Sequence, residues 1–183
     1  HWIEVAANSL EGAGDFIDEM REIAISLTRT QIKPLPIQLL ELINSVKERV
    51  ITEYSIERDQ IKVHISEETT VDGCSLTKEL LWNIFDNAFK HNSNILLIKE
   101  IYVNSSRVVL EISDRGGGLV DNIKDYLNNP DSLSGQAPPG MGLGVVLIQG
   151  LATMCRSDLY VQDFVEDSKV VGTTYTLNFR VSQ

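Results

Sequence analysis

Three short stretches of the sequence carry residue types that can bind a nucleotide and its metal ion. They are, in chain order, Asn83, Asn87 and Lys90; Asp114, Gly116 and Gly118; and Gly140, Gly142 and Gly144. Amide oxygens can ligate Mg²⁺ without adding negative charge, and an ammonium group can neutralise a phosphate oxygen. A carboxylate can accept a hydrogen bond from the amine of adenine, and successive glycines expose backbone N–H groups to phosphate. Together the three stretches predict a pocket for ATP and Mg²⁺.

The first stretch is predicted to lie on a helix over residues 76–90. At about 100° per residue this helix has one apolar face, made of Leu80, Leu81, Ile84, Phe85, Ala88 and Phe89. Asn83, Asn87, Lys90 and His91 fall on a narrow polar stripe beside that face. Taken alone, such a stripe is more typical of a solvated helix surface, because Asn is common there.

The other two stretches lie where strands and helices meet. Asp114 ends a predicted strand and begins a glycine-rich turn, and the third stretch opens a helix predicted over residues 145–154. The N-terminus of that helix would add a positive partial charge. The spacing G-x-G-x-G differs from the dinucleotide fingerprint, since Val145 stands where the last glycine belongs and a polar loop precedes it. Taken alone, the stretch from Asp114 to Gly118 could also be an ordinary glycine-rich hairpin turn. Taken alone, the stretch from Gly140 to Gly144 could also be a flexible linker.

In combination, these stretches resemble the ATP-binding domain of sensor histidine kinases, within the gyrase, chaperone, histidine kinase and mismatch-repair ATPase superfamily. The resemblance covers about residues 37–181. It implies that Asn83 and Asn87 face Mg²⁺ and the phosphates and that Lys90 contacts phosphate. It also implies that His91, at a position that is usually aromatic in the family, lies near the adenine.

The resemblance assigns the rest of the nucleotide pocket to the two glycine-rich stretches and the last strand. Asp114 is implied to bind the adenine amine, and a mobile lid is implied between the two glycine-rich stretches. The other implied nucleotide contacts are Gly116, Gly118, Gly140, Gly142, Leu143, Gly144 and Thr173.

Asn83 decides which chemistry the resemblance implies. Hydrolytic members of the superfamily, and the anti-sigma kinases, carry Glu at this position, where it can polarise a water or a hydroxyl. An amide cannot take a proton at neutral pH, so brisk hydrolysis is not expected. The prediction is a protein-histidine kinase of a two-component system, with Asn83 and Lys90 as its catalytic residues. Positioning and metal charge would carry most of the transfer to an imidazole.

The phosphorylated histidine is expected upstream of this chain. The family's acceptor box, a His followed by an acid, does not occur in the sequence, and His1 is followed by Trp-Ile-Glu. The expected partners are the chain's own dimerisation hairpin, as a homodimer in the full-length protein, and a response-regulator receiver domain, whose aspartate takes the phosphoryl group.

Two other functions stay open. One is a degenerate domain that binds nucleotide, or nothing, and acts by docking to a partner. The composition of the lid favours this function, because Lys124 is the only basic residue of the lid and Tyr126 its only aromatic residue, so its grip on phosphate would be weak. The other is a stand-alone ATPase or serine kinase, which Asn83 disfavours.

Composition narrows the class of protein further. The 183 residues carry a formal net charge of -10, which argues against nucleic-acid binding. No apolar run approaches the roughly 20 residues of a membrane span, so no membrane contact by this fragment is expected. Cys74 and Cys155 are predicted to be buried free thiols, consistent with a reducing compartment. The expected location is the cytoplasm, where the fragment could also be the inner part of a membrane-bound sensor.

The order of elements predicts an α+β fold, a two-layer sandwich with helices on a mixed sheet, of the Bergerat type that the resemblance implies. Residues 1–33 are predicted to hold the second helix of the dimerisation hairpin, and 34–183 the catalytic domain. Pro36 suits the first turn of the next helix. Alternating apolar residues predict strands over 61–65, 95–103, 108–112, 159–164 and 171–179, and residues 120–139 read as a long polar loop.

Overall fold

The computed structural model describes residues 33–90, 96–104, 106–129 and 141–182. The predicted leading helix, with nearly all of the predicted segment 1–33, lies outside these residues. His91 and Gly140, two of the predicted nucleotide contacts, lie outside them as well.

A five-stranded mixed sheet forms one layer of the domain. Its strands, in spatial order, are β2 (Ile61–His64), β4 (Leu96–Asn104), β5 (Arg107–Asp114), β7 (Lys169–Arg180) and β6 (Asp158–Glu166). β2 and β4 are parallel, and the other neighbours are antiparallel. The strands predicted from alternation are therefore confirmed, each with small shifts at its ends.

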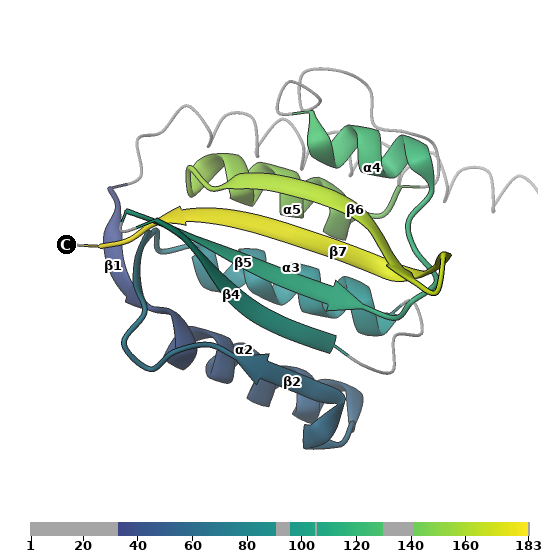
Figure 1. Cartoon of the computed structure of the whole chain (residues 1–183), viewed down its shortest axis with the longest axis horizontal. Coiled ribbons are helices and arrows are strands. Elements are labelled where there is room, and N and C mark those ends of the chain that lie inside the picture. The colour runs from purple at the N-terminus through teal and green to yellow at the C-terminus, as the bar shows by residue number, and fades with distance from the viewer. Residues whose placement is uncertain (1–32, 91–95, 105, 130–140, 183) are drawn as a thin grey trace, which may run out of the picture.

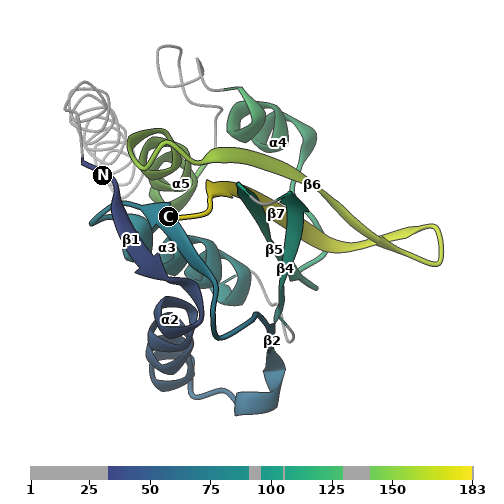
Figure 2. The same cartoon turned by 60° about the vertical axis from the view of Figure 1, so that its left-hand side comes forward.

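Three helices form the second layer against one face of this sheet, as Figures 1 and 2 show. They are α2 (Leu39–Tyr54), α3 (Thr77–Lys90) and α5 (Leu143–Met154). The apolar residues of α2 recur every three or four positions, and Leu39, Ile43, Val46 and Val50 are fully buried. The predicted α+β sandwich is confirmed. None of the described helices is both long and apolar enough to cross a membrane.

Alternation along the central strands explains why only one face of the sheet joins the core. Ile98 of β4 lies opposite Ile112 of β5, and both are fully buried. One residue along, Lys99 lies opposite Glu111 and forms an ion pair at 2.7 Å. Because successive side chains of a strand point to opposite faces of the sheet, one set packs against the helices and the other set faces solvent.

The chain before α2 differs from its prediction. Pro36 lies in a short strand, β1 (Leu35–Gln38), which pairs antiparallel with β3 (Thr70–Gly73), so the prediction of a helical first turn at Pro36 is wrong. The missing N–H of a proline is tolerated in an edge strand. The helix begins three residues later, where the Gln38 side chain accepts a hydrogen bond from the Glu41 N–H at 3.0 Å.

Part of the predicted loop is a helix. α4 (Asp121–Asn128) occupies the first half of the stretch that was predicted to be irregular. Its buried residues are Tyr126 and Leu127, and the Asn128 side chain bonds both the N–H and the C=O of Val161 in β6, at 2.6 and 2.8 Å. These contacts hold α4 against the edge of the sheet, although its sequence is mostly polar.

The prediction of two free thiols is also wrong. Cys74 and Cys155 form a disulfide, with their Cα atoms 5.3 Å apart. Cys74 follows β3 and precedes α3, while Cys155 ends α5, so packing of α5 beside α3 brings them together. They are 81 residues apart in sequence, which hid this proximity. The cysteines therefore no longer support a reducing compartment.

Candidate nucleotide-binding site

A cavity of about 630 Å³ is lined by α3, by the glycine turn after β5, by the start of α4 and by the N-terminus of α5. Seven of the residues predicted from sequence line it: Asn87, Lys90, Gly116, Gly118, Gly142, Leu143 and Gly144. Five further lining residues were not predicted: Asp86, Leu119, Val120, Ile123 and Val145. Three stretches that are far apart in sequence thus meet around one space large enough for a small ligand.

Asn87 enters the cavity from the polar edge of α3 and is held by the last strand of the sheet. Its amide nitrogen donates to the hydroxyl of Tyr175 in β7 at 2.8 Å. Burial, and next the charge of Asp114, raise the pKa of Tyr175, while the hydrogen bond from Asn87 lowers it. The phenol therefore stays neutral. Because the nitrogen of Asn87 is engaged with protein, its oxygen is the atom suited to bind a cation.

Asn83 lies one turn earlier on α3 and is half-buried. Its amide nitrogen donates to the carbonyl oxygen of Glu79 at 2.8 Å, which again leaves the oxygen as the atom that could face a ligand. Asn83 is not among the residues that line the cavity. Its predicted contact with Mg²⁺ stays a prediction.

Lys90 is positioned by a carboxylate that the sequence analysis did not single out. The Lys90 ammonium pairs with Asp86 at 2.6 Å, and the hydroxyl of Tyr54 in α2 donates to the other Asp86 oxygen at 2.5 Å. Burial, and then the hydrogen bond to Asp86, raise the pKa of Tyr54. The i, i+4 spacing of Asp86 and Lys90 was a signal in the sequence, whereas Tyr54 is too distant for any local pattern.

We expect Asp86 to matter for stability mainly through Tyr54. A double-mutant cycle of Asp86→Ala and Tyr54→Phe should give a coupling energy of about 1–2 kcal/mol, because a half-buried hydroxyl bonds a charged acceptor. The matching cycle of Asp86→Ala with Lys90→Ala should give about 0.5 kcal/mol or less, since the Lys90 side chain is 61% exposed. Urea denaturation measures both cycles, and equal coupling energies would contradict this ranking.

Asp114 ends β5 and is almost fully buried, with 4% of its surface exposed. Its Oδ1 accepts hydrogen bonds from the N–H of Gly116 at 2.8 Å and from the N–H of Thr173 in β7 at 3.3 Å. Beside it, the hydroxyls of Ser113 and Thr174 bond each other at 2.8 Å. Neither Asp114 nor Thr173 is among the lining residues, but Gly116, bonded to the Asp114 carboxylate, is.

The turn after Asp114 depends on glycine at two positions. Gly117 and Gly118 have φ angles of +88° and +87°, a conformation that residues with a Cβ rarely adopt. The turn brings Gly118 into the cavity lining and directs the chain toward α4. Gly116 and Gly118, which were predicted to shape the pocket, both line the cavity, and their contact with a nucleotide stays a prediction.

The N-terminus of α5 presents backbone to the cavity without side chains in the way. Gly142 is the N-cap and Leu143 the first helical residue. Among the described residues, beyond its own chain neighbours and helix backbone, a Cβ built on Gly142 or on Gly144 would meet no atom within 4 Å. Contacts with the described residues therefore do not require glycine here, and a ligand in the cavity would face the backbone of the helix start.

The start of the predicted lid contributes an apolar wall. Val120 and Ile123 line the cavity, whereas Lys124 pairs with Asp163 at 2.7 Å and with Asp121 at 2.9 Å. The ammonium group of Lys124 is thus bonded to carboxylates and is not among the lining groups.

Comparison with known proteins decides the family. Residues 72–183, more than half of the chain, match the family described as histidine kinase-, DNA gyrase B-, and HSP90-like ATPase. The chain belongs to this family. As a histidine kinase-like ATPase domain, it has an ATP-binding fold, and residues of all three stretches that were predicted to bind nucleotide line the cavity. No curated protein sequence matches the chain.

Solved structures share the fold of this ATPase domain. The mycobacterial sensor histidine kinase MprB is 21% identical, with a TM-score of 0.64 over 81% of this chain and 97% of that one. The Acinetobacter baumannii histidine kinase AdeS is 14% identical, with a TM-score of 0.62 over 99% and 84%. Full-length ShkA, in complex with AMPPNP, is 17% identical, with a TM-score of 0.63 over 94% of this chain and 37% of that one. At these identities the likeness shows a common fold.

Proposed function

We propose that the chain is the catalytic ATP-binding part of a two-component sensor histidine kinase. The observation that carries this proposal is the open helix start at Gly142 and Gly144, which faces the same cavity as Asn87 and Lys90. An anion at that helix start would meet backbone N–H groups and a positive partial charge. Lys90 supplies a full positive charge in a chain whose formal net charge is -10.

The adenine end of ATP fits the Asp114 corner. The carboxylate is fixed by two backbone N–H groups, so its orientation is set before a ligand arrives. Leu119, Val120 and Ile123 offer apolar surface in the cavity on which a flat ring can lie. His91 and Gly140, which lie outside the described residues, remain proposed contacts on the same argument from the sequence.

Mg²⁺ would be held by Asn83 and Asn87 together with phosphate oxygens. The nitrogen of each amide donates to a protein acceptor, which leaves both oxygens for a cation. No group of three His, Cys, Asp or Glu residues suited to a metal occurs in the described part of the chain. Bound Mg²⁺ would neutralise charge that develops on the phosphates.

In the proposed reaction, an imidazole nitrogen from upstream of this chain attacks the γ-phosphorus, and the bond from phosphorus to the β–γ bridging oxygen breaks to release ADP. Asn83 and Lys90 orient the phosphates, and neither residue removes a proton. A response-regulator aspartate then accepts the phosphoryl group. Residues 1–33 would be the second helix of the dimerisation hairpin in a homodimer, and 34–183 the catalytic domain, working in the cytoplasm.

Gly144→Ala tests the phosphate side of the proposal. A methyl group here meets none of the described residues within 4 Å and improves helix propensity, so the melting temperature should be unchanged or slightly higher. The methyl would occupy ligand space, and the affinity for an ATP analogue should fall about tenfold. Calorimetric titration measures this. Thr153→Ala, at the far end of the same helix, is the control and should bind like wild type. Unchanged affinity in Gly144→Ala would remove the helix start from the site.

A second candidate is a degenerate domain that binds nucleotide and acts by docking. The pairing of Lys124 with Asp121 and Asp163 favours it, because no basic group of the described lid faces the cavity. Adding a dimerisation hairpin with its histidine in trans, together with γ-labelled ATP, separates the two functions. Labelled phosphohistidine supports the kinase; nucleotide binding without any label supports the docking module. Rapid steady-state hydrolysis would instead favour a stand-alone ATPase.

A further inference from the structure

The disulfide joins the two helices that line the nucleotide cavity, at their ends away from it. Cys74 lies three residues before α3, and Cys155 directly follows α5. The last turn of α3 and the first turn of α5 line the cavity. The helices therefore run in opposite directions between the two places (Figure 1), and the disulfide fixes their spacing at one end.

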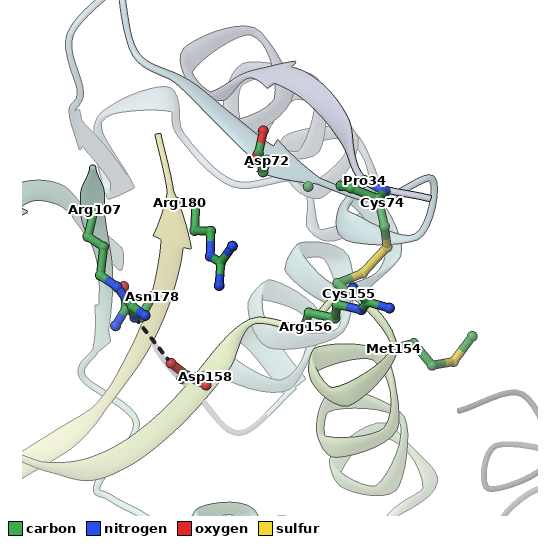
Figure 3. A pocket seen from close by; sticks show the side chains of 11 residues that line it. Pro34, Asp72, Cys74, Arg107, Met154, Cys155, Arg156, Asp158, Asn178 and Arg180 are labelled. Carbon is green, nitrogen blue, oxygen red and sulfur yellow. Dashed lines mark ion pairs between the residues drawn. A yellow bond between two sulfur atoms is a disulfide. The ribbon is translucent and has the colours of Figure 1, made fainter. Parts of the chain in front are cut away.

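A second cavity, of about 210 Å³, borders this disulfide. Both cysteines line it, together with Arg107, Arg156 and Arg180 (Figure 3). Both cysteines are buried, with 3% and 6% of their surface exposed, so a reductant has to approach the sulfur atoms through the cavity that they line. A neighbouring cavity of about 660 Å³ shares Arg107 and Arg180 with it, which widens the approach.

The charged side chains that line the cavity beside the disulfide are net positive, with Arg107, Arg156 and Arg180 against Asp72 and Asp158. Arg107 pairs with Asp158 at 3.5 Å, but no described acidic side chain pairs with Arg156 or Arg180. Arg156 is also the residue next to Cys155 in the sequence. Guanidinium groups bind carboxylates in a fixed fork geometry, so a carboxylate-bearing molecule would be drawn to this cavity in an otherwise acidic protein.

We propose that the Cys74–Cys155 disulfide is a thiol–disulfide exchange site, reduced by a small carboxylate-bearing thiol of the glutathione class that enters this arginine-lined cavity, and that its reduction weakens nucleotide binding. The effect on nucleotide rests on the ATP site proposed above. The exchange chemistry does not depend on that site.

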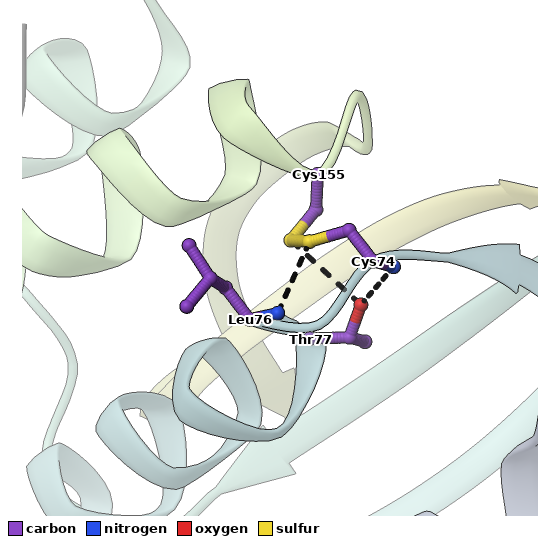
Figure 4. Close-up of a disulfide and its surroundings, with 4 residues drawn as sticks. All are labelled: Cys74, Leu76, Thr77 and Cys155. Atoms are coloured by element: carbon purple, nitrogen blue, oxygen red, sulfur yellow. Dashed lines mark hydrogen bonds between the residues drawn. A yellow bond between two sulfur atoms is a disulfide. The ribbon is translucent and has the colours of Figure 1, made fainter. Parts of the chain in front are cut away.

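The environment of the two sulfur atoms sets the direction of attack. The Leu76 N–H donates to Cys74 Sγ at 3.3 Å, and the N-terminus of α3 follows, so negative charge is better stabilised on Cys74 (Figure 4). The incoming thiolate therefore attacks Cys155 Sγ, the disulfide bond breaks, and its electron pair leaves on Cys74. A second thiol attacks the mixed disulfide and releases Cys155. Two thiols are oxidised to their disulfide, and their two protons end on the two cysteines.

Reduction removes the one covalent link between α5 and α3. Packing then holds the helices, aided by a weak hydrogen bond from the Thr77 hydroxyl to Cys155 Sγ at 3.7 Å. In a more mobile α5, Gly142 and Gly144 would be less well ordered. Ordering them on nucleotide binding would then cost more conformational entropy, which weakens the affinity. Disulfides in compartments rich in ATP and thiols are usually transient or regulatory, which fits a switch better than a permanent brace.

The test compares the oxidised and the glutathione-reduced chain. Maleimide labelling followed by mass spectrometry counts thiols, and titration with a fluorescent ATP analogue gives the affinity. We expect reduction to raise Kd roughly fivefold or more. Cys74→Ser should bind like the reduced wild type, with or without glutathione. Equal affinity of the oxidised and reduced forms, or two labelled thiols before any reductant, would overturn the proposal.

The arginine-lined cavity is tested by the reduction rate. Arg156→Gln should slow reduction by glutathione several-fold and leave the rate with neutral 2-mercaptoethanol unchanged. Equal slowing with both thiols, or no slowing, would show that the cavity does not select the reductant. If the analogue binds neither form, the ATP site and its coupling fail, while the difference in rates still reports on the exchange site alone.

Discussion

Asp114→Asn should lower the affinity for ATP about 10- to 100-fold while leaving the fold intact. The two backbone N–H groups of Gly116 and Thr173 both donate to Oδ1 of Asp114, so an amide placed there must turn its oxygen toward them. Its NH₂ group would then face the adenine amine, donor against donor. Because the substitution keeps the shape and both backbone hydrogen bonds, the loss should appear in binding and not in unfolding. Titration with an ATP analogue measures it.

Two controls separate this hydrogen bond from a simple change of charge. Asp121→Asn removes the same charge from a side chain that is 93% exposed, and its affinity should stay near that of wild type. GTP carries a carbonyl where ATP carries the amine, so Asp114→Asn should lose less affinity for GTP than for ATP. Equal binding of ATP by wild type and Asp114→Asn would refute the proposed hydrogen bond between the Asp114 carboxylate and the adenine amine.

The residues of the candidate site were largely predictable because their chemistry is local. Each pattern can be recognised from residues that are neighbours in the sequence, without knowledge of distant contacts. The patterns are an amide one turn from a lysine, a carboxylate at the end of a strand, and glycines before a helix. Seven of these predicted residues line the cavity. Asp86 was missed because its partner Tyr54 comes from another helix, and an acid within a mixed polar stripe looks like ordinary surface.

The parts of the fold that could not be predicted depend on contacts between distant segments. β1 and β3 are four residues each and pair with each other as a two-stranded sheet, too short for either to have a strong pattern of its own. α4 forms in a polar sequence because Asn128 and Lys124 bond to β6. The disulfide needs α3 and α5 side by side, and sequence spacing carries no trace of it. Local propensity is a weak prior that tertiary contacts override.

Gly172→Ala should destabilise the domain by about 2–4 kcal/mol, and the reason links the fold to the adenine corner. A Cβ at Gly172 would overlap the carbonyl oxygen of Asp114 and lie 2.9 Å from the Cα of Arg115. These are backbone atoms, which cannot rotate away, so β7 would have to separate from the end of β5. Thr173, the next residue, would lose its position beside the carboxylate. Urea denaturation measures the stability, and the melting temperature should fall by roughly 10 °C.

Alanine substitutions at two other glycines test whether the loss of stability in Gly172→Ala comes from close backbone packing. Gly117→Ala meets no atom of the described residues within 4 Å but requires a φ of +88°, so it should cost only about 1–2 kcal/mol. Gly142→Ala meets neither obstacle, since its φ is -74°, and the loss of a good N-cap residue should cost about 0.5–1 kcal/mol. The expected order of destabilisation is Gly172, then Gly117, then Gly142. Wild-type stability in Gly172→Ala would mean that β5 and β7 do not approach closely where the adenine corner is built.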